Sequence, residues 1–175
     1  MNRRRLVSAA AVIGLGASLG LVAPGSVSAQ ESLIACGSGN QTQRYSPGLT
    51  NTPRDITIHV SGSVGNCADP ANPDRAYATF EGSGQGKASC LLGVLPTTVT
   101  YKWSDGGTSK IYFQAGVDVK PAGQSFVTVN GVVIAGEYEG HHAVKHILLT
   151  NVNIAKCSSQ DGLDETGGST NLIIT

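Results

Sequence analysis

The sequence predicts an all-β domain, an antiparallel Ig-like β-sandwich of about seven to nine short strands. Two patterns predict this class: segments in which apolar and polar residues alternate with period two, and turn residues that recur about every ten positions. Composition agrees, because the chain has 23 glycines and 14% charged residues. Glycine is costly inside a helix and useful in tight turns. No segment shows a helical period.

The first 29 residues have the pattern of an export signal. Three arginines at 3–5 precede an apolar stretch at 6–23, and the small residues Val27, Ser28 and Ala29 suit a signal peptidase. We therefore expect a signal peptide over 1–29 and a single secreted domain over 30–175. The arginines fit an ordinary secretory signal and also, loosely, a twin-arginine signal, so the export route stays open.

The four cysteines are predicted to form two disulfides, because an exported chain meets an oxidising compartment. No C-x-x-C motif is present, which disfavours a zinc or redox site. Three connectivities are possible, and sequential pairing is favoured because it joins neighbouring strands of a meander. The favoured pairs are Cys36–Cys67 and Cys90–Cys157.

The N-terminal half has two alternating segments, at 55–61 and 75–81, that predict strands. A short apolar run at 32–35 leads into Cys36. The remaining segments are rich in turn residues and are predicted to be irregular. They are the polar segment 37–55, the loop 67–74 and the glycine-rich turn 82–86 before a strand at Cys90.

The C-terminal half predicts two strand pairs. Residues 97–103 and 109–119 form a hairpin, because Asp-Gly and Gly-Gly at 105–107 suit a primed turn. Residues 126–134 and 143–153 form the second pair, joined near 137–140. The rest is predicted to be a polar loop at 161–169 and a terminal strand at 171–175.

Three histidines lie within six residues, at His141, His142 and His146. The i, i+4 pair would bind one metal ion on a helix, but on a strand its members stand about 13 Å apart. Acidic loops at 69–74 and 161–165 lack the spacing of a calcium loop. We therefore expect no metal and no other cofactor.

No catalytic site is predicted. The chain has no G-x-S-x-G motif. Glu137 and Glu139 would share a strand face like a glycosidase pair, yet the chain has few aromatic residues to line a sugar cleft. Trp103 is expected to pack in the core, and as an alternative to serve as an exposed platform for sugar.

The predicted function is a non-enzymatic secreted binding or accessory domain that contacts another secreted or cell-surface protein through an edge strand or hairpin. Nucleic-acid and membrane binding are not expected, because loss of the leader's three arginines leaves a net charge of −3. Two alternatives stay open. One is a carbohydrate or cell-wall binding module using Trp103, and the other is an inhibitor of an extracellular protease using the loop 70–73 beside Cys67.

Beyond its four cysteines, the chain carries three short motifs: YSPGLT at 45–50, WSDGGTS at 103–109 and GEYEG at 136–140. With them the mature chain resembles small exported actinobacterial proteins of unknown function. The resemblance implies a common fold through turn and core residues, and it carries no functional residue over. The arginine- and alanine-rich leader is similar to leaders of the same bacteria.

Overall fold

The computed structural model describes residues 32–91, 95–114, 117–119, 125–150 and 152–175. The expected signal peptide, 1–29, and the expected first mature residue, Gln30, lie outside the described residues. Ten strands and one short 3-10 helix are found in the described part of the chain. They are β1 (Ile34–Leu49), β2 (Arg54–Ala68), β3 (Ala78–Ala88), β4 (Thr97–Trp103), β5 (Thr108–Phe113), β6 (Val117–Val119), β7 (Ser125–Gly136), β8 (His142–Leu149), η1 (Ile154–Ser158), β9 (Leu163–Thr170) and β10 (Leu172–Ile174).

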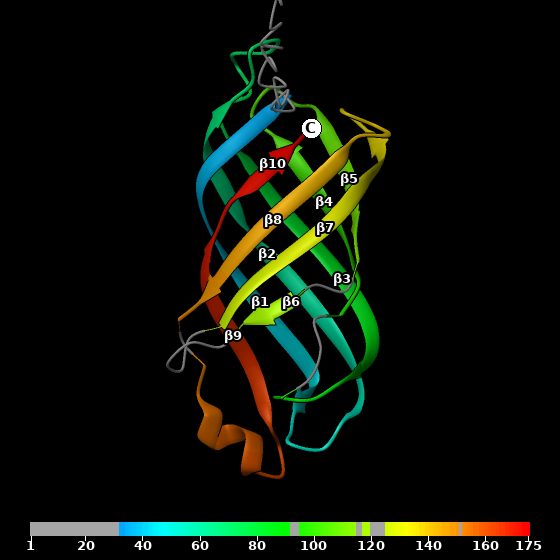
Figure 1. Cartoon of the computed structure of the whole chain (residues 1–175), viewed down its shortest axis with the longest axis vertical. Coiled ribbons are helices and arrows are strands. Elements are labelled where there is room, and N and C mark those ends of the chain that lie inside the picture. The colour runs from blue at the N-terminus through cyan, green and yellow to red at the C-terminus, as the bar shows by residue number, and fades with distance from the viewer. Residues whose placement is uncertain (1–31, 92–94, 115–116, 120–124, 151) are drawn as a thin grey trace, which may run out of the picture.

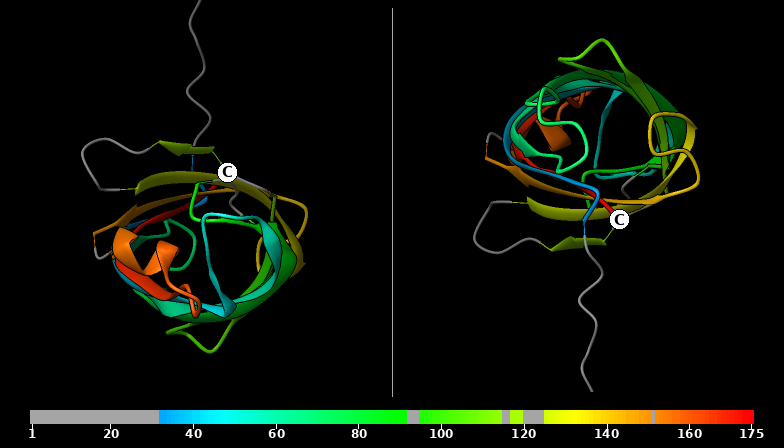
Figure 2. Two further views of the ribbon diagram at one scale, coloured as in Figure 1. Left: turned by 90° about the horizontal axis from the view of Figure 1, so that it is seen from below. Right: turned by 90° about the horizontal axis from the view of Figure 1, so that it is seen from above.

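The strands form one antiparallel sheet that closes on itself. Each strand from β1 to β4 pairs with the next along the chain, β5 pairs with β7, and β7 pairs with β8. β9 and β10 lie end to end between β8 and β1, and each of them pairs with both of these strands. Together they close the ring. The result is an eight-stranded barrel, and Figure 2 shows the ring from both ends. β6 continues along the edge of β7 beyond β5.

The predicted Ig-like sandwich is therefore wrong, although the all-β antiparallel class is confirmed. Two segments predicted to be irregular are strands that close the barrel. The segment 37–55 holds most of the 16-residue β1, and 161–169 holds most of β9. Their register pairs Gln41 with Gly168, so the polar, glycine-rich sequence is the seam of the barrel.

Glycine in these strands marks close approach of two backbones rather than a turn. A Cβ atom at Gly168 would overlap the carbonyl oxygen of Leu148 on β8. The predicted turn at 82–86 is likewise part of β3, where Gly82 pairs with Val60 and Val99. The strand predicted over 75–81 begins only at Ala78, because Arg75 belongs to the preceding loop.

Several other predictions are confirmed. The turn at 104–106 joins β4 to β5, and the turn at 137–140 joins β7 to β8. The disulfides are Cys36–Cys67, between β1 and β2, and Cys90–Cys157, between the segment after β3 and η1. Two disulfides indicate an oxidising setting. Among the residues that the structure describes, no helix has the length and apolar character needed to cross a membrane.

The barrel has two different ends (Figure 1). At one end, called here the Trp103 end, β4 finishes and the Cys36–Cys67 bridge lies. Large aromatic rings fill this half, where Tyr101 stacks on Trp103 with centroids 5.9 Å apart. At the other end, called the η1 end, β1 finishes near η1 and the Cys90–Cys157 bridge.

Candidate functional site

A cavity of about 330 Å³ occupies the η1 half of the barrel interior. Its walls are mostly aliphatic, because the alternating strands turn their apolar side chains inward. The volume lies near the lower limit of about 300–1,000 Å³ for small-molecule pockets. The aliphatic lining includes Ile56, Ile58 and Val60 of β2, Val127 and Val129 of β7, and Ile147 and Leu149 of β8.

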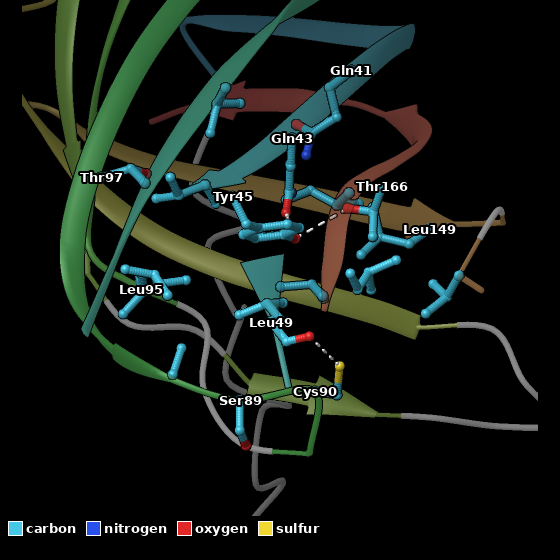
Figure 3. Close-up of a pocket in the computed structure, with 18 of the residues that line it drawn as sticks. Gln41, Gln43, Tyr45, Leu49, Ser89, Cys90, Leu95, Thr97, Leu149 and Thr166 are labelled. Carbon is cyan, nitrogen blue, oxygen red and sulfur yellow. Dashed lines mark hydrogen bonds between the residues drawn. The ribbon is translucent and has the colours of Figure 1, made fainter. Parts of the chain in front are cut away.

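Polar side chains reach the cavity from β1, β8 and β9. Gln41, Gln43 and Tyr45 follow one another on the inner face of β1, and Thr166 of β9 faces them. The Tyr45 hydroxyl donates to Oε1 of Gln43 at 2.6 Å and lies 3.0 Å from Oγ1 of Thr166. Figure 3 shows the Tyr45 ring between Gln43 and Leu49. Tyr45 therefore stands between the inner part of the cavity, which holds Gln41 and Gln43, and a mostly apolar outer part.

Gln41 is buried, with 3% of its surface exposed. Neither its Oε1 nor its Nε2 has a hydrogen-bond partner among the described residues. A buried polar group left unpaired costs about 1–3 kcal/mol. Since Gln41 lines the cavity, its amide is a donor and acceptor available to a bound molecule.

Lys145 is another buried polar group of the inner part, with 2% exposure. Its Nζ lies 3.9 Å from the centroid of the Phe80 ring, and the rings of Tyr101 and Phe113 are next nearest, at 5.9 and 5.8 Å. Among the described residues that line the cavity, Lys145 is the one with a charged side chain. Burial disfavours the ammonium form and lowers the pKa of Lys145 to about 7.

A charged cluster closes the opposite, Trp103 end. The Arg75 guanidinium is buried and lies 2.6 Å from Oδ2 of Asp105, 3.2 Å from Oε2 of Glu137 and 3.6 Å from Oδ2 of Asp69. It also covers the Trp103 and Tyr138 rings at 5.8 and 5.0 Å. Because its partners come from three connecting segments, the cluster ties those loops over the end of the barrel.

Hydrogen bonds set the protonation of the two aspartates in this cluster. The guanidinium of Arg75 and the backbone N–H of Gly107 hold the pKa of Asp105 below its usual value. At Asp69 burial raises the pKa, but donors from Tyr138, Asn72 and Ala71 outweigh it and lower the pKa. Both aspartates are therefore ionised partners of Arg75 near neutral pH.

The histidines are not brought together as a site. His142 and His146 lie on β8, as the strand interpretation predicts, and no group of His, Cys, Asp or Glu suited to a metal occurs among the described residues. Nδ1 of His146 instead lies 3.0 Å from Oδ1 of Asn171. Glu137 pairs with Arg75, while Glu139 is exposed.

Trp103 is a core residue, with 4% exposure, and its Nε1 donates to Oγ of Ser109 at 2.8 Å. It therefore offers no exposed face for stacking on sugar. The loop 70–73 is exposed, and Asp69 holds it by accepting hydrogen bonds from the backbone N–H groups of Ala71 and Asn72.

The cavity residues Gln41, Gln43 and Tyr45 are missed by sequence reasoning, because their segment is predicted to be irregular. The three residues are spaced two apart in the sequence, and this spacing is the pattern that indicates one face of a strand. Lys145 is missed as well, although it interrupts the inward series Ala143, Ile147 and Leu149. A lysine on an otherwise apolar face was the signal for a buried amine.

No protein-family model, no curated protein and no solved structure gave a significant match to this chain.

Proposed function

We propose that this chain is a non-enzymatic exported binding domain whose barrel interior holds a small, mostly apolar molecule. One observation carries the proposal: the cavity contains a buried amide, Gln41, whose Oε1 and Nε2 have no partner among the described residues. A site of this kind, with apolar walls and a few convergent polar groups, is typical of small-molecule binding.

The size of the cavity limits the ligand. At about 30 Å³ for each water-sized group, 330 Å³ has room for about ten such groups. Filling the cavity with apolar groups is favourable by about 25 cal/mol per Å² of apolar surface removed from water. Medium-length alkyl chains and compounds of up to three aromatic rings are therefore the expected size class.

Export is supported by the leader at 1–29 and by the two disulfides. Contact with a secreted or cell-surface protein stays a separate prediction. The backbone of β6 is the place for it, because β6 ends the pairing order of the described strands and has β7 on one side. Inhibition of an extracellular protease through the loop 70–73 also stays a prediction.

A fluorescence titration with N-phenyl-1-naphthylamine tests the cavity proposal. The full chain is produced by export so that both disulfides form, and the expected result is saturable binding with one probe per protein. In Val129→Phe a larger ring enters the cavity from β7, and probe affinity is expected to fall at least tenfold.

The matched control is Ile134→Phe, on the exposed face of the same strand, which is expected to keep the wild-type affinity. Thermal melts establish that both variants are folded. Absence of saturable binding, or equal binding by Val129→Phe and wild type, would refute the proposal.

A further inference from the structure

We propose that the cavity selects its ligand by a carboxylate headgroup, which Lys145 and Gln41 hold at the inner end while an apolar tail extends toward the η1 end. The ligand class is a medium-length monocarboxylate amphiphile. This inference rests on the proposed function, since it specifies the molecule that the cavity takes.

The first argument is the charge of the cavity. The described lining residues include no aspartate, glutamate, histidine or arginine, so no protein carboxylate there balances the Lys145 ammonium. The Phe80 ring, 3.9 Å from Nζ, compensates only part of the lost hydration. An ammonium taken out of water needs an anion with good hydrogen-bond geometry, and a carboxylate supplies one.

The second argument is that Gln41 and Lys145 both lie beside Phe80. The Cζ atom of Phe80 is 2.7 Å from the point where a Cβ of Gly62 would stand, and the Cα atom of Gln41 is 2.9 Å from the same point. Gly62 therefore lets the Phe80 ring lie against β1 next to Gln41. The Lys145 ammonium lies on the same ring, so Gln41 and Lys145 are both neighbours of Phe80 at the inner end.

The donor chemistry fits one carboxylate. Its two oxygens accept one hydrogen bond from the Nζ of Lys145 and one from the Nε2 of Gln41. The Oε1 of Gln41 stays available to a water molecule that accompanies the headgroup. An alcohol of the same length also reaches these groups but leaves the ammonium without a counter-charge.

The third argument is the polarity gradient along the cavity. Toward the η1 end the lining is mostly apolar and includes Leu49 and Leu95 (Figure 3), and its polar residues there, such as Asn51 and Ser89, are uncharged. A ligand with one charged end and one apolar tail matches this order. The tail then lies near the Cys90–Cys157 disulfide, which also lines the cavity.

The affinity for a carboxylate is expected to depend on pH through Lys145. Its pKa of about 7 means that the free protein carries the ammonium below pH 7 and a neutral amine above it. A bound carboxylate favours the ammonium form of Lys145. The affinity for the carboxylate therefore falls above pH 7, by a factor that approaches ten for each pH unit.

The side chains that face Lys145 from the neighbouring strands are aromatic or aliphatic. From β4 it meets Tyr101, whose pKa burial raises further above its usual value. From β3 and β5 it meets Phe80 and Phe113. The cavity adds the phenol of Tyr45 from β1, and Val129 is the partner of Lys145 on β7.

The test measures displacement of N-phenyl-1-naphthylamine by decanoate and by 1-decanol, at pH 6 and pH 9. The wild type is expected to bind decanoate at least tenfold more tightly than 1-decanol at pH 6 and to lose that preference at pH 9. Lys145→Met is expected to bind decanoate no more tightly than 1-decanol at either pH, because no cation is left to pair with the carboxylate, and to keep its affinity for the probe. Gln41→Leu is expected to lower the affinity for decanoate by a smaller factor, three- to tenfold.

The control is Lys110→Met on the exposed face of β5, which is expected to keep the wild-type preference. Equal affinity for decanoate and 1-decanol at pH 6, or a preference that survives in Lys145→Met, would overturn the carboxylate inference and leave the cavity function standing. If neither the probe nor either decyl compound binds, the proposed function and this inference are both refuted.

Discussion

The Nζ atom of Lys145 stands 3.9 Å from the centroid of the Phe80 ring, where the aromatic half of the barrel meets the cavity. A desolvated cation–π contact is worth about 2 kcal/mol, whereas the desolvation of one ion costs several. The pair is therefore a net cost to the empty fold. A lysine that lowers stability at the wall of a cavity is typical of a group retained for binding.

Lys145→Met is expected to make the ligand-free protein more stable at neutral pH. The pKa of Lys145 is lowered to about 7 from 10.5, so between these values the unfolded chain holds a proton that the native protein has released. Wild-type stability therefore rises with pH across this window. The cost of the buried charge is fully present below pH 7, on the order of 3–5 kcal/mol.

Chemical denaturation at pH 7 and pH 9.5 measures this effect. The difference in free energy of unfolding between Lys145→Met and wild type is expected to shrink at the higher pH. Lys110→Met, whose side chain is exposed, is the control and should show no such change. A variant less stable than wild type at pH 7 would contradict the expectation.

Arg75→Leu is expected to destabilise the protein by about 3–5 kcal/mol, because it leaves the buried carboxylate of Asp69 without its cation. The matched control is Arg44→Leu. Arg44 also forms an ion pair, with Glu165, but both side chains are exposed, so the expected loss is below about 1 kcal/mol. Urea unfolding compares the two variants, and equal losses would show that the Arg75 cluster does not hold the Trp103 end.

The two disulfides are expected to affect binding differently. Cys90 and Cys157 line the cavity, whereas Cys36–Cys67 lies at the Trp103 end. Replacing Cys90 and Cys157 by alanine should lower stability by about 4 kcal/mol and weaken N-phenyl-1-naphthylamine binding at least fivefold. Replacing Cys36 and Cys67 should lower stability but leave the affinity of the folded protein unchanged. Equal effects of both double variants on affinity would contradict this assignment.

The hairpins were predictable because their signals are local. Asp105 and Gly106 specify the β4–β5 turn, and the alternation from Val99 to Trp103 specifies an inward face. Barrel closure depends instead on the pairing of Ile34 with Ile174, at opposite ends of the described chain. Alternation is the same in a sandwich and a barrel, so the pattern did not distinguish them.

The candidate site was harder to predict than the strands. Gln41 can be recognised as a binding residue only when β1 is known to be a strand whose inner face lines a cavity. Sequence reasoning assigned its surroundings to turns, since glycine and proline at 46–48 are typical of loops. Lys145 lay on a correctly predicted strand, but the absence of a carboxylate among the described residues that line the cavity is a tertiary property.

Neighbouring glycines on β9 test whether the seam of the barrel requires close backbone approach. A Cβ at Gly168 would overlap the carbonyl oxygen of Leu148, a backbone atom with little freedom to move, whereas a Cβ at Gly167 would lie 3.4 Å from the carbonyl oxygen of Gln41. Gly168→Ala is therefore expected to cost about 1–3 kcal/mol, the usual range for overpacking. Gly167→Ala should change stability by less than about 0.5 kcal/mol. Thermal and urea unfolding compare the pair, and equal stability of the two variants would mean that β8 and β9 do not pair through the register Leu149 to Gly168.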